Sequence, residues 1–199
     1  MFSNVVEDVV AVLSEGKQLK LVYADSGEVL SDLSVQQIPE PRKLYLQASQ
    51  GQFLVLPEAL SEEDPSLDFF NPIIDAVHVH GAIYAVNRET KALAWELPVT
   101  HRQVRLLTCT QTRPLLPNLP LLVLLSRDRD PKSQKFSVVI GAQVVDVRNG
   151  KLLYEDGNTG LTQNELWLSS DAENRQLCLS FDRRFVTFSY GVDKIQPAP

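Results

Sequence analysis

The chain of 199 residues has few of the features that mark a metalloprotein or a disulfide-stabilised secreted domain. It contains two cysteines, three histidines and one methionine. Cys109 and Cys178 both stand in apolar, strand-like contexts, and neither has a partner at metal-ligand spacing, so a structural zinc site is not indicated. We interpret both as small buried hydrophobic residues. Whether they pair stays open, because a disulfide requires Cα atoms within roughly 7 Å of each other.

Positive charge and long apolar runs are also scarce. The net charge is −6 and the pI is about 5.1, which argues against a nucleic-acid partner because such proteins carry a basic surface that neutralises phosphates. No segment reaches the roughly 20 apolar residues that span a bilayer. The longest candidate, 115–125, is interrupted by Pro117 and Pro120. The N-terminus lacks the basic and apolar pattern of a signal peptide. We therefore expect no transmembrane segment.

Motifs that carry catalysis are missing as well. A catalytic serine with His101 has no supporting nucleophile elbow, and no glycine-rich phosphate loop precedes a helix. The acids at 62–64 lie in an acidic loop, where solvation explains them. The segment 156–164 is rich in oxygen ligands but lacks the EF-hand spacing. The sequence thus predicts no catalytic, cofactor-binding or metal-binding residues and no cofactor, and it favours a protein that is not an enzyme.

What the chain does contain is a series of short strands. Alternating apolar residues at 18–24 and 29–35 flank a turn at Asp25–Glu28, and Gly27 there is free to adopt positive φ. Further strands are expected at 43–48, 52–56, 75–80, 82–87, 92–97, 104–110, 121–125, 135–145, 151–155, 165–169, 175–180 and 184–190. A charged hairpin loop is expected at 127–134, and a frayed tail at 193–199.

Two segments suggest exceptions to the strand pattern. Residues 4–12 place Val5, Val9 and Val12 on one helical face, so we favour a helix there, although branched valine suits a strand equally well. The acidic, proline-bounded segment 57–72 predicts a surface loop or one short helix around 61–63. In that segment Phe69-Phe70, and later Trp167, are either core residues or anchors of a protein interface.

A strand–turn–strand unit recurs along the chain. It reads AIYAVNRETKALAWEL at 82–97, AQVVDVRNGKLLYE at 142–155, and more faintly LKLVYADSGEVLSDL at 19–33. Aligning the turns makes Tyr23, Asn87 and Asp146 equivalent, with separations of 64 and 59 residues. An Asp or Asn at this position can bond backbone amides two or three residues on and so hold the turn. The repeat therefore predicts a propeller, a sandwich or a barrel.

The two clear copies resemble the pyrroloquinoline-quinone-like (PQQ-like) β-propeller repeat, whose signature is Ala-x-Asp-x-x-Thr-Gly, three residues and Trp. The first copy matches at Ala85, Asn87, Thr90 and Trp95 and has Lys91 in place of glycine. The second copy matches at Asp146, Gly150 and Tyr154 and has Val144 and Asn149 at the other positions. The faint copy keeps only Ser26-Gly27.

The resemblance implies an all-β fold of four-stranded antiparallel blades, forming a partial or small propeller; a β-sandwich is the alternative. It implies one repeat domain over 1–199, with approximate repeats at 15–72, 73–126 and 127–191, as the C-terminal part of a longer chain. In this family the signature tryptophan packs between neighbouring blades. Members that bind the quinone carry acidic metal ligands and vicinal cysteines, which find no match here. Members without cofactor are protein-binding scaffolds, and this chain fits them better.

On this basis the expected function is a non-catalytic scaffold that binds another protein or the remainder of its own chain. A bacterial cell-envelope location follows if the chain belongs to an exported propeller, and a cytoplasmic one if Met1 is the natural start.

Two alternatives stay open. His78 and His80 share one face of a strand, and His101 or Asp75 could supply a third ligand, which would make a metal-dependent module or an enzyme domain. A carbohydrate- or peptide-binding β domain is the other alternative.

Overall fold

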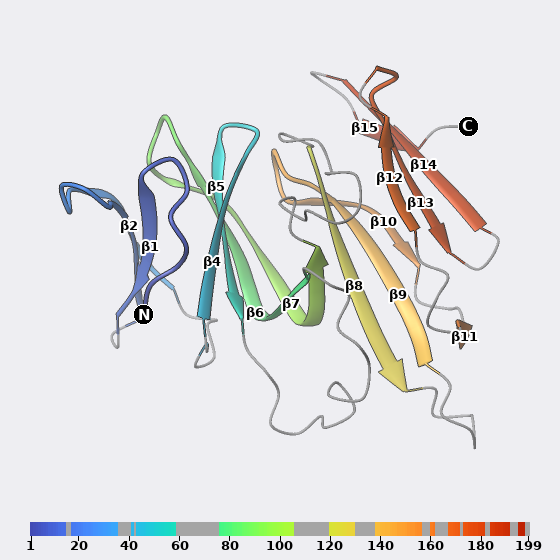
Figure 1. The fold of residues 1–199 in the computed structure, drawn as a ribbon, viewed down its shortest axis with the longest axis horizontal. Coiled ribbons are helices and arrows are strands. Elements are labelled where there is room, and N and C mark those ends of the chain that lie inside the picture. Colours follow the sequence, from blue (N-terminus) through green and yellow to red (C-terminus); the bar gives the residue numbers. More distant parts are fainter. Residues whose placement is uncertain are drawn as a thin grey trace.

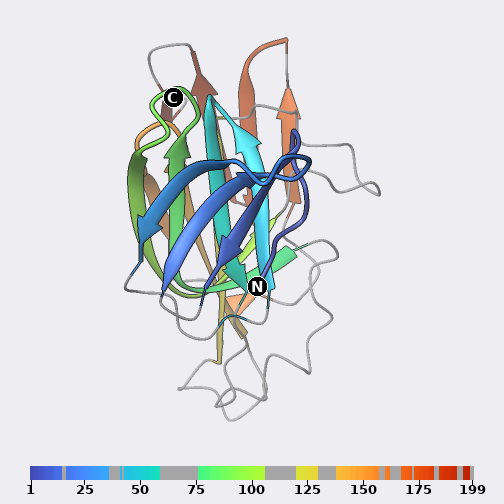
Figure 2. The same cartoon turned by 90° about the vertical axis from the view of Figure 1, so that its left-hand side faces the viewer.

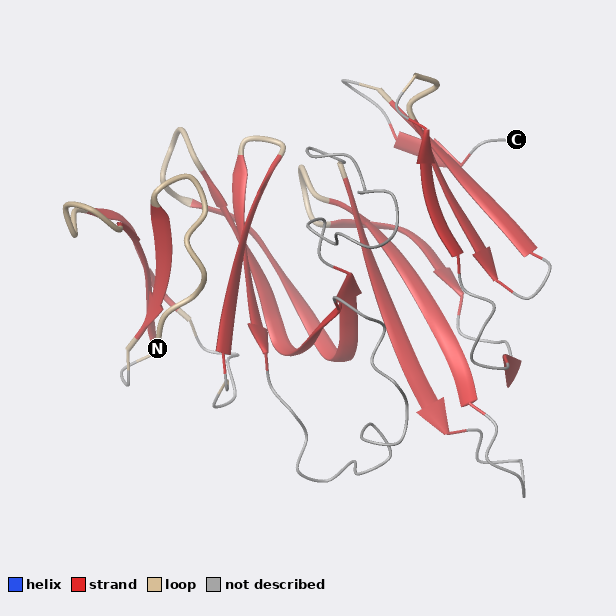
Figure 3. Cartoon of the chain, in the orientation of Figure 1, coloured by secondary structure: helices blue, strands red, loops and turns tan. Residues whose placement is uncertain are grey.

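The computed structural model describes residues 1–14, 17–35, 41, 43–58, 76–105, 120–129, 138–156, 160–161, 167–171, 173–181, 184–191 and 195–197. Within these ranges the chain forms strands and turns, and none of the described residues is helical (Figure 3). The strands are β1 (Val9–Leu13), β2 (Gln18–Tyr23), β3 (Val29–Ser34), β4 (Lys43–Ser49), β5 (Gln52–Glu58), β6 (Ala76–Asn87), β7 (Leu93–Arg105), β8 (Leu121–Arg129), β9 (Val138–Asp146), β10 (Lys151–Asp156), β11 (Gly160–Leu161), β12 (Trp167–Asp171), β13 (Gln176–Phe181), β14 (Arg184–Tyr190) and β15 (Ile195–Pro197). The fold is all-β, as predicted.

All strand pairs are antiparallel, and within each sheet neighbours in sequence pair with each other, except that β11 pairs with β9. We divide the strands into four blades: blade 1 (β1–β3), blade 2 (β4–β7), blade 3 (β8–β11) and blade 4 (β12–β15). Blades 2 and 3 are joined by pairing between β7 and β8, which among the described residues links Gln103 with Leu125 and Val104 with Leu124. Figure 1 shows the blades following one another across the molecule in chain order. Consecutive up-and-down sheets of this kind are the building units of a propeller.

The predicted helix at 4–12 is wrong. Residues 7 and 8 instead form a tight turn, in which Val6 and Val9 exchange backbone hydrogen bonds of 2.9 Å. The N-terminal segment then runs back along β1, because Phe2 bridges Val12. The segment therefore serves as a fourth strand of blade 1. Branched valines disfavour a helix. Pairing in a strand satisfies the hydrogen bonds of their backbone N–H and C=O groups as well as a helix would.

Several predicted strands turn out to be parts of longer ones. The strands expected at 75–80 and 82–87 are one twelve-residue strand, β6. Those expected at 92–97 and 104–110 are joined in the thirteen-residue strand β7, which is described as far as Arg105, whereas 106–110 lie outside the described ranges. Gly81, with φ of 106°, and two bulges allow this hairpin to bend without ending. β8 also continues to Arg129, into the predicted charged loop. The predicted frayed tail is wrong in part, since β15 pairs with β14. Residues 59–75, including the expected helix at 61–63, lie outside the described ranges.

Blade 2 is buried on both faces, and this burial distinguishes a stack of blades from a two-sheet sandwich. One face of blade 2 packs against blade 1 in a core that includes Leu21, Phe53 and Tyr84. The opposite face packs against blade 3 in a second core that includes Trp95 and Leu124. Figure 2 shows blade 1 lying across blade 2. In a two-sheet sandwich each sheet keeps one face toward solvent, whereas six consecutive residues of β5 are buried here.

Candidate functional site on the turn face

Three hairpins place equivalent turns at one end of the stack, which we call the turn face. In each turn the fifth residue donates its backbone N–H to the carbonyl of the first: Gly27 to Tyr23 at 2.9 Å, Lys91 to Asn87 at 2.8 Å, and Gly150 to Asp146 at 2.8 Å. These fifth residues have φ of 70°, 60° and 71°. The alignment predicted from the sequence is therefore confirmed, and Lys91 adopts a left-handed backbone that favours glycine.

The first residue of two turns caps its own loop. The Oδ1 atom of Asn87 accepts hydrogen bonds from the backbone amides of Glu89 and Thr90, at 2.9 and 2.8 Å. The Oδ1 atom of Asp146 accepts a bond of 2.9 Å from the amide of Arg148. This is the local role that the sequence predicted for these residues. The turns depend on these bonds for their shape, so Asn87 and Asp146 are structural residues.

All three hairpins also share a bulge seven residues after the turn begins. The extra residue is Leu30 in β3, Ala94 in β7 and Leu153 in β10, since each is passed over in the pairing register. A bulge re-aims the side chain that follows it. That next position is Ser31 in blade 1, Trp95 in blade 2, and Tyr154 in blade 3.

Trp95 closes the junction between blades 2 and 3, which we call junction 2–3. Its indole Nε1–H donates a hydrogen bond of 2.7 Å to the backbone carbonyl of Val147, the second residue of the next turn. Its ring covers Gly150, where an added Cβ would lie 2.9 Å from the indole Cδ2 atom. Glycine is required here both by its positive φ and by this close approach. The expectation that Trp95 packs between neighbouring blades is confirmed.

Blade 3 reaches blade 4 in a similar direction. The ring of Tyr154 meets the buried ring of Phe188 edge-on, with centroids 5.9 Å apart. The guanidinium of Arg148 is held by both oxygens of Asp146 and donates a weaker bond of 3.3 Å to the carbonyl of Gly191. Aromatic and polar contacts therefore fasten this pair of blades together.

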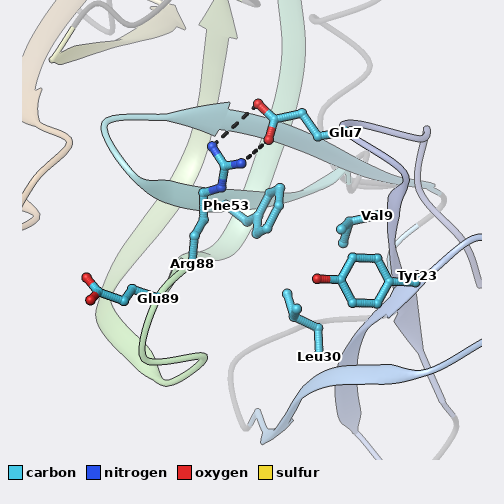
Figure 4. A pocket seen from close by; sticks show the side chains of 7 residues that line it. All are labelled: Glu7, Val9, Tyr23, Leu30, Phe53, Arg88 and Glu89. Carbon is cyan, nitrogen blue, oxygen red and sulfur yellow. Dashed lines mark hydrogen bonds and ion pairs between the residues drawn. The ribbon is translucent and has the colours of Figure 1, made fainter.

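The junction between blades 1 and 2, junction 1–2, is built differently. Ser31 occupies the tryptophan position; it is buried, and its Oγ has no hydrogen-bond partner in the described part of the chain. Lys91 occupies the glycine position of the receiving turn. A pocket of about 320 Å³ opens at this junction (Figure 4). It is lined by Glu7, Val9, Tyr23, Leu30, Phe53, Arg88 and Glu89. The pocket lies where the motif lacks its aromatic residue.

Charges are arranged around one wall of this pocket. Arg88 forms an ion pair with Glu7 across the junction, and its guanidinium lies 5.1 Å from the centre of the Phe53 ring. Glu89 stands beside Arg88 at the rim with its carboxylate turned outward, while the Tyr23 hydroxyl points across the pocket from the opposite wall (Figure 4). Since Glu7 neutralises Arg88, the lining carries a net negative charge from Glu89. Pockets of this volume accommodate a side chain or a small ligand.

A fourth turn of related design joins β12 to β13, and the sequence analysis missed it. The segment DAENRQL at 171–177 repeats the Asp and Asn spacing of DVRNGKL at 146–152, which is the signal that identifies it. Asn174 donates its amide N–H and its side-chain N–H to the Asp171 carboxylate, at 3.0 and 2.7 Å. The amide bond and then the side-chain bond lower the pKa of Asp171. Burial, with a smaller effect of the Asp171 charge, raises the pKa of Tyr190.

The structure locates only some of the residues in the predicted histidine site. His78 and His80 both lie in β6. Val79 pairs with Arg102 and Gly81 pairs with Val99, so β7 has a bulge opposite His80 that contains His101. The side chains of His78 and His101, and all of Asp75, lie outside the described part of the chain, and His80 is half-buried. Among the described residues no group of three or more His, Cys, Asp or Glu is placed to hold a metal ion. The metal hypothesis therefore stays a prediction.

Of the other sequence candidates, Cys178 is a half-buried free thiol in β13. Cys109, Phe69-Phe70 and the acids at 62–64 lie outside the described residues. So does the side chain of Trp167, although its backbone begins β12. None of the described segments contains a helix long and apolar enough to cross a bilayer.

Comparison with known proteins leaves the family open. No protein-family model matches the chain, and no curated protein matches it. Similar solved structures include the computationally designed Ika8 protein, with a TM-score of 0.44, 12% identity, and coverage of 95% of this chain and 46% of that one. The WD40 domain of Toxoplasma gondii coronin has a TM-score of 0.42 and 8% identity, with coverage of 96% of this chain and 42% of that one. The C-terminal WD40 domain of Sif2 has a TM-score of 0.31 and 11% identity, with coverage of 94% of this chain and 53% of that one. The chain spans about half the length of each.

Proposed function

We propose that this chain is a non-catalytic propeller-type scaffold that binds another protein, or the remainder of its own chain, through the turn face. The observation that carries the proposal is the pocket at junction 1–2, which is an open site between two rigid blades at an end built from exposed turns. Loops held on a rigid scaffold are the usual location of recognition sites. Side chains of a partner segment would enter the pocket, and the neighbouring turns would contact its backbone.

We also propose that the chain is a divergent member of the PQQ-like repeat family without the quinone site, and that it acts in the bacterial cell envelope. Its support is the hairpin design, in which a capped turn, a positive-φ residue and an aromatic residue that packs against the next blade recur at the signature's spacing. The role that these residues play is structural. None of them is arranged to polarise a substrate or to transfer a proton.

A selection from a random-peptide display library tests the scaffold function. Enriched peptides are expected to bind the whole chain, and their amide chemical-shift changes are expected to centre on the turns that include Tyr23 and Arg88. A Phe53→Ala variant, which removes one wall of the pocket, should weaken binding, whereas a Phe185→Ala variant should not, because Phe185 is exposed on blade 4. Loss of binding in a His78→Ala, His80→Ala variant, or a requirement for zinc, would contradict the proposal and favour the metal-dependent alternative.

A further inference from the structure

Junctions 1–2 and 2–3 present equivalent turns, but only junction 2–3 holds an indole. The pocket at junction 1–2 is lined by Leu30, the residue before Ser31, and by Arg88 and Glu89 of the receiving turn. Trp95 reaches the second residue of the next turn and donates its N–H to the carbonyl of Val147. The second residue of the receiving turn at junction 1–2 is Arg88, which lines the pocket. Within the described residues the Arg88 carbonyl accepts no hydrogen bond. The first blade offers Ser31 where a tryptophan would stand, so the chain leaves a hydrogen-bond acceptor open to a group supplied from outside.

The receiving turn also shows why that group is not an indole. Trp95 packs on Gly150, and a Cβ at that position would come within 2.9 Å of the ring. At junction 1–2 the equivalent residue is Lys91, which shares the positive φ of Gly150 but carries a Cβ. A flat aromatic ring is therefore disfavoured at junction 1–2, and a narrow, flexible side chain is favoured.

The charges around the pocket favour a ligand of positive charge. The three turns that meet here, at 6–9, 23–28 and 87–92, contain the five acids Glu7, Asp8, Asp25, Glu28 and Glu89 and only two bases, Arg88 and Lys91. Arg88 is already paired with Glu7, whereas the Glu89 carboxylate has no ion pair among the described residues. Val9 and Leu30 supply an apolar wall for the stem of a long side chain.

From these observations we infer that the junction 1–2 pocket binds a basic side chain, arginine or lysine, of a partner polypeptide. This inference rests on the proposed scaffold function and names the chemistry of the partner. The aliphatic stem lies against Val9 and Leu30, and the cationic head lies at the mouth of the pocket, where it pairs with Glu89 and donates to the Arg88 carbonyl. A cation is favoured because it is a donor and is opposite in sign to the surrounding turns.

Titration of the whole chain with N-acetyl-arginine amide, followed by amide chemical shifts, tests the inference. The neutral isostere N-acetyl-citrulline amide and the aromatic N-acetyl-tryptophan amide are the comparison probes. Saturable shifts at Tyr23, Phe53 and Arg88 are expected with arginine amide, and they should weaken as salt is added because the charges are exposed. Citrulline amide should bind about fivefold or more weakly, equivalent to roughly 1 kcal/mol. Equal binding of the citrulline or tryptophan probe overturns the inference.

Two sets of variants complete the test. Glu89→Gln removes an exposed charge without altering the fold and should weaken arginine amide about threefold or more, which corresponds to a fraction of 1 kcal/mol. The matched control Glu173→Gln removes an exposed charge from blade 4 and should leave binding unchanged. A Ser31→Trp, Lys91→Gly double variant restores the tryptophan and glycine pair of junction 2–3 and should abolish binding, because its indole is expected to donate to the Arg88 carbonyl. An unchanged affinity in Glu89→Gln, or shifts centred away from the pocket, would refute the inference.

Failure of this inference can be distinguished from failure of the scaffold proposal. If display-selected peptides bind at the turn face without any enrichment of arginine or lysine, the scaffold function stands and the basic-side-chain specificity is wrong. If no peptide binds at the turn face, the scaffold function itself is wrong.

Discussion

Junctions 1–2 and 2–3 are built from the same hairpin, yet they are closed by different means. At junction 2–3 a tryptophan lies on a glycine and donates to a backbone carbonyl. At junction 1–2 a serine and a lysine occupy those two positions, and a pocket remains beside an ion pair. The two substitutions belong together, because an indole needs the glycine beneath it, and without an indole the glycine is no longer needed. One junction is therefore closed by an indole, and the other keeps the pocket in which we propose that a partner side chain binds.

The largest effect is expected from Trp95→Ala. This change empties the site at junction 2–3 and removes the bond to Val147, so it should lower the free energy of unfolding by about 3–5 kcal/mol. Urea denaturation measures the loss. Trp95→Phe keeps most of the apolar volume and loses only the N–H donor, so it should cost about 1–2 kcal/mol. A loss of under about 1 kcal/mol for the alanine variant would show that junction 2–3 does not depend on the indole.

Gly150→Ala should have the next largest effect, and Gly27→Ala is its matched control. Both glycines have φ near 70°, but only at residue 150 does an added Cβ meet the indole; at residue 27 nothing lies within 4 Å. The backbone penalty alone should cost about 1 kcal/mol in Gly27→Ala. The clash should raise the loss in Gly150→Ala to about 2–4 kcal/mol. Equal losses in thermal or urea unfolding would mean that contact with Trp95 adds nothing.

The coupling between the tryptophan and glycine positions can be measured at junction 1–2. Ser31→Trp alone should destabilise blade 1, because the indole meets the Cβ of Lys91, and Lys91→Gly alone should relieve a left-handed backbone. In the double variant the two changes should cooperate by about 1–2 kcal/mol, as residues in direct contact do. A double-mutant cycle of unfolding free energies provides the measurement. Simple additivity would contradict the view that both junctions share one design.

The smallest effect concerns the fourth turn, which contributes to neither junction. The pKa of Asp171, the first residue of this turn, is lowered in the folded protein. The Asp171 carboxylate therefore favours folding at pH values above its unfolded pKa. That contribution is lost as pH falls through the folded pKa. The fall in stability between neutral pH and pH about 3 should therefore be slightly smaller in Asp171→Asn than in the unsubstituted chain. Glu173→Gln, in the same turn, is the control and should follow the unsubstituted chain. An identical pH profile for Asp171→Asn would contradict the assignment.

Much of the hairpin architecture could be predicted because its signals are local. The turns at Tyr23, Asn87 and Asp146 follow from side chains that bond amides within three residues and from glycines that tolerate positive φ. The interblade role of Trp95 came from the family resemblance. The turn at Asp171 was missed because it has neither the glycine nor the aromatic residue of the signature: Arg175, with φ of 51°, is its fifth residue, and Leu179 stands at the tryptophan position.

Other features could not be predicted because they depend on distant partners. The N-terminal helix was a reasonable prediction from valine periodicity, but pairing with β1 and the hydrogen bonds between the Asn4 side chain and the backbone of Leu46 favour a strand. Whether β6 is one strand or two depended on whether Gly81 ends it, and the pairing with β7 across a bulge carries it through.

The sequence by itself determined that the chain is all-β, that its hairpins repeat, and that Asn87 and Asp146 hold their turns. Those properties arise from alternation, turn chemistry and spacing, which act over a few residues, whereas the role of Trp95 was implied by the family resemblance. Only the tertiary structure decided that the indole lies on the glycine of the following blade and that a pocket lies at the preceding junction, where serine and lysine replace that pair. Trp95 and Gly150 are 55 positions apart in the chain. Packing between blades creates this contact, and no local pattern encodes it.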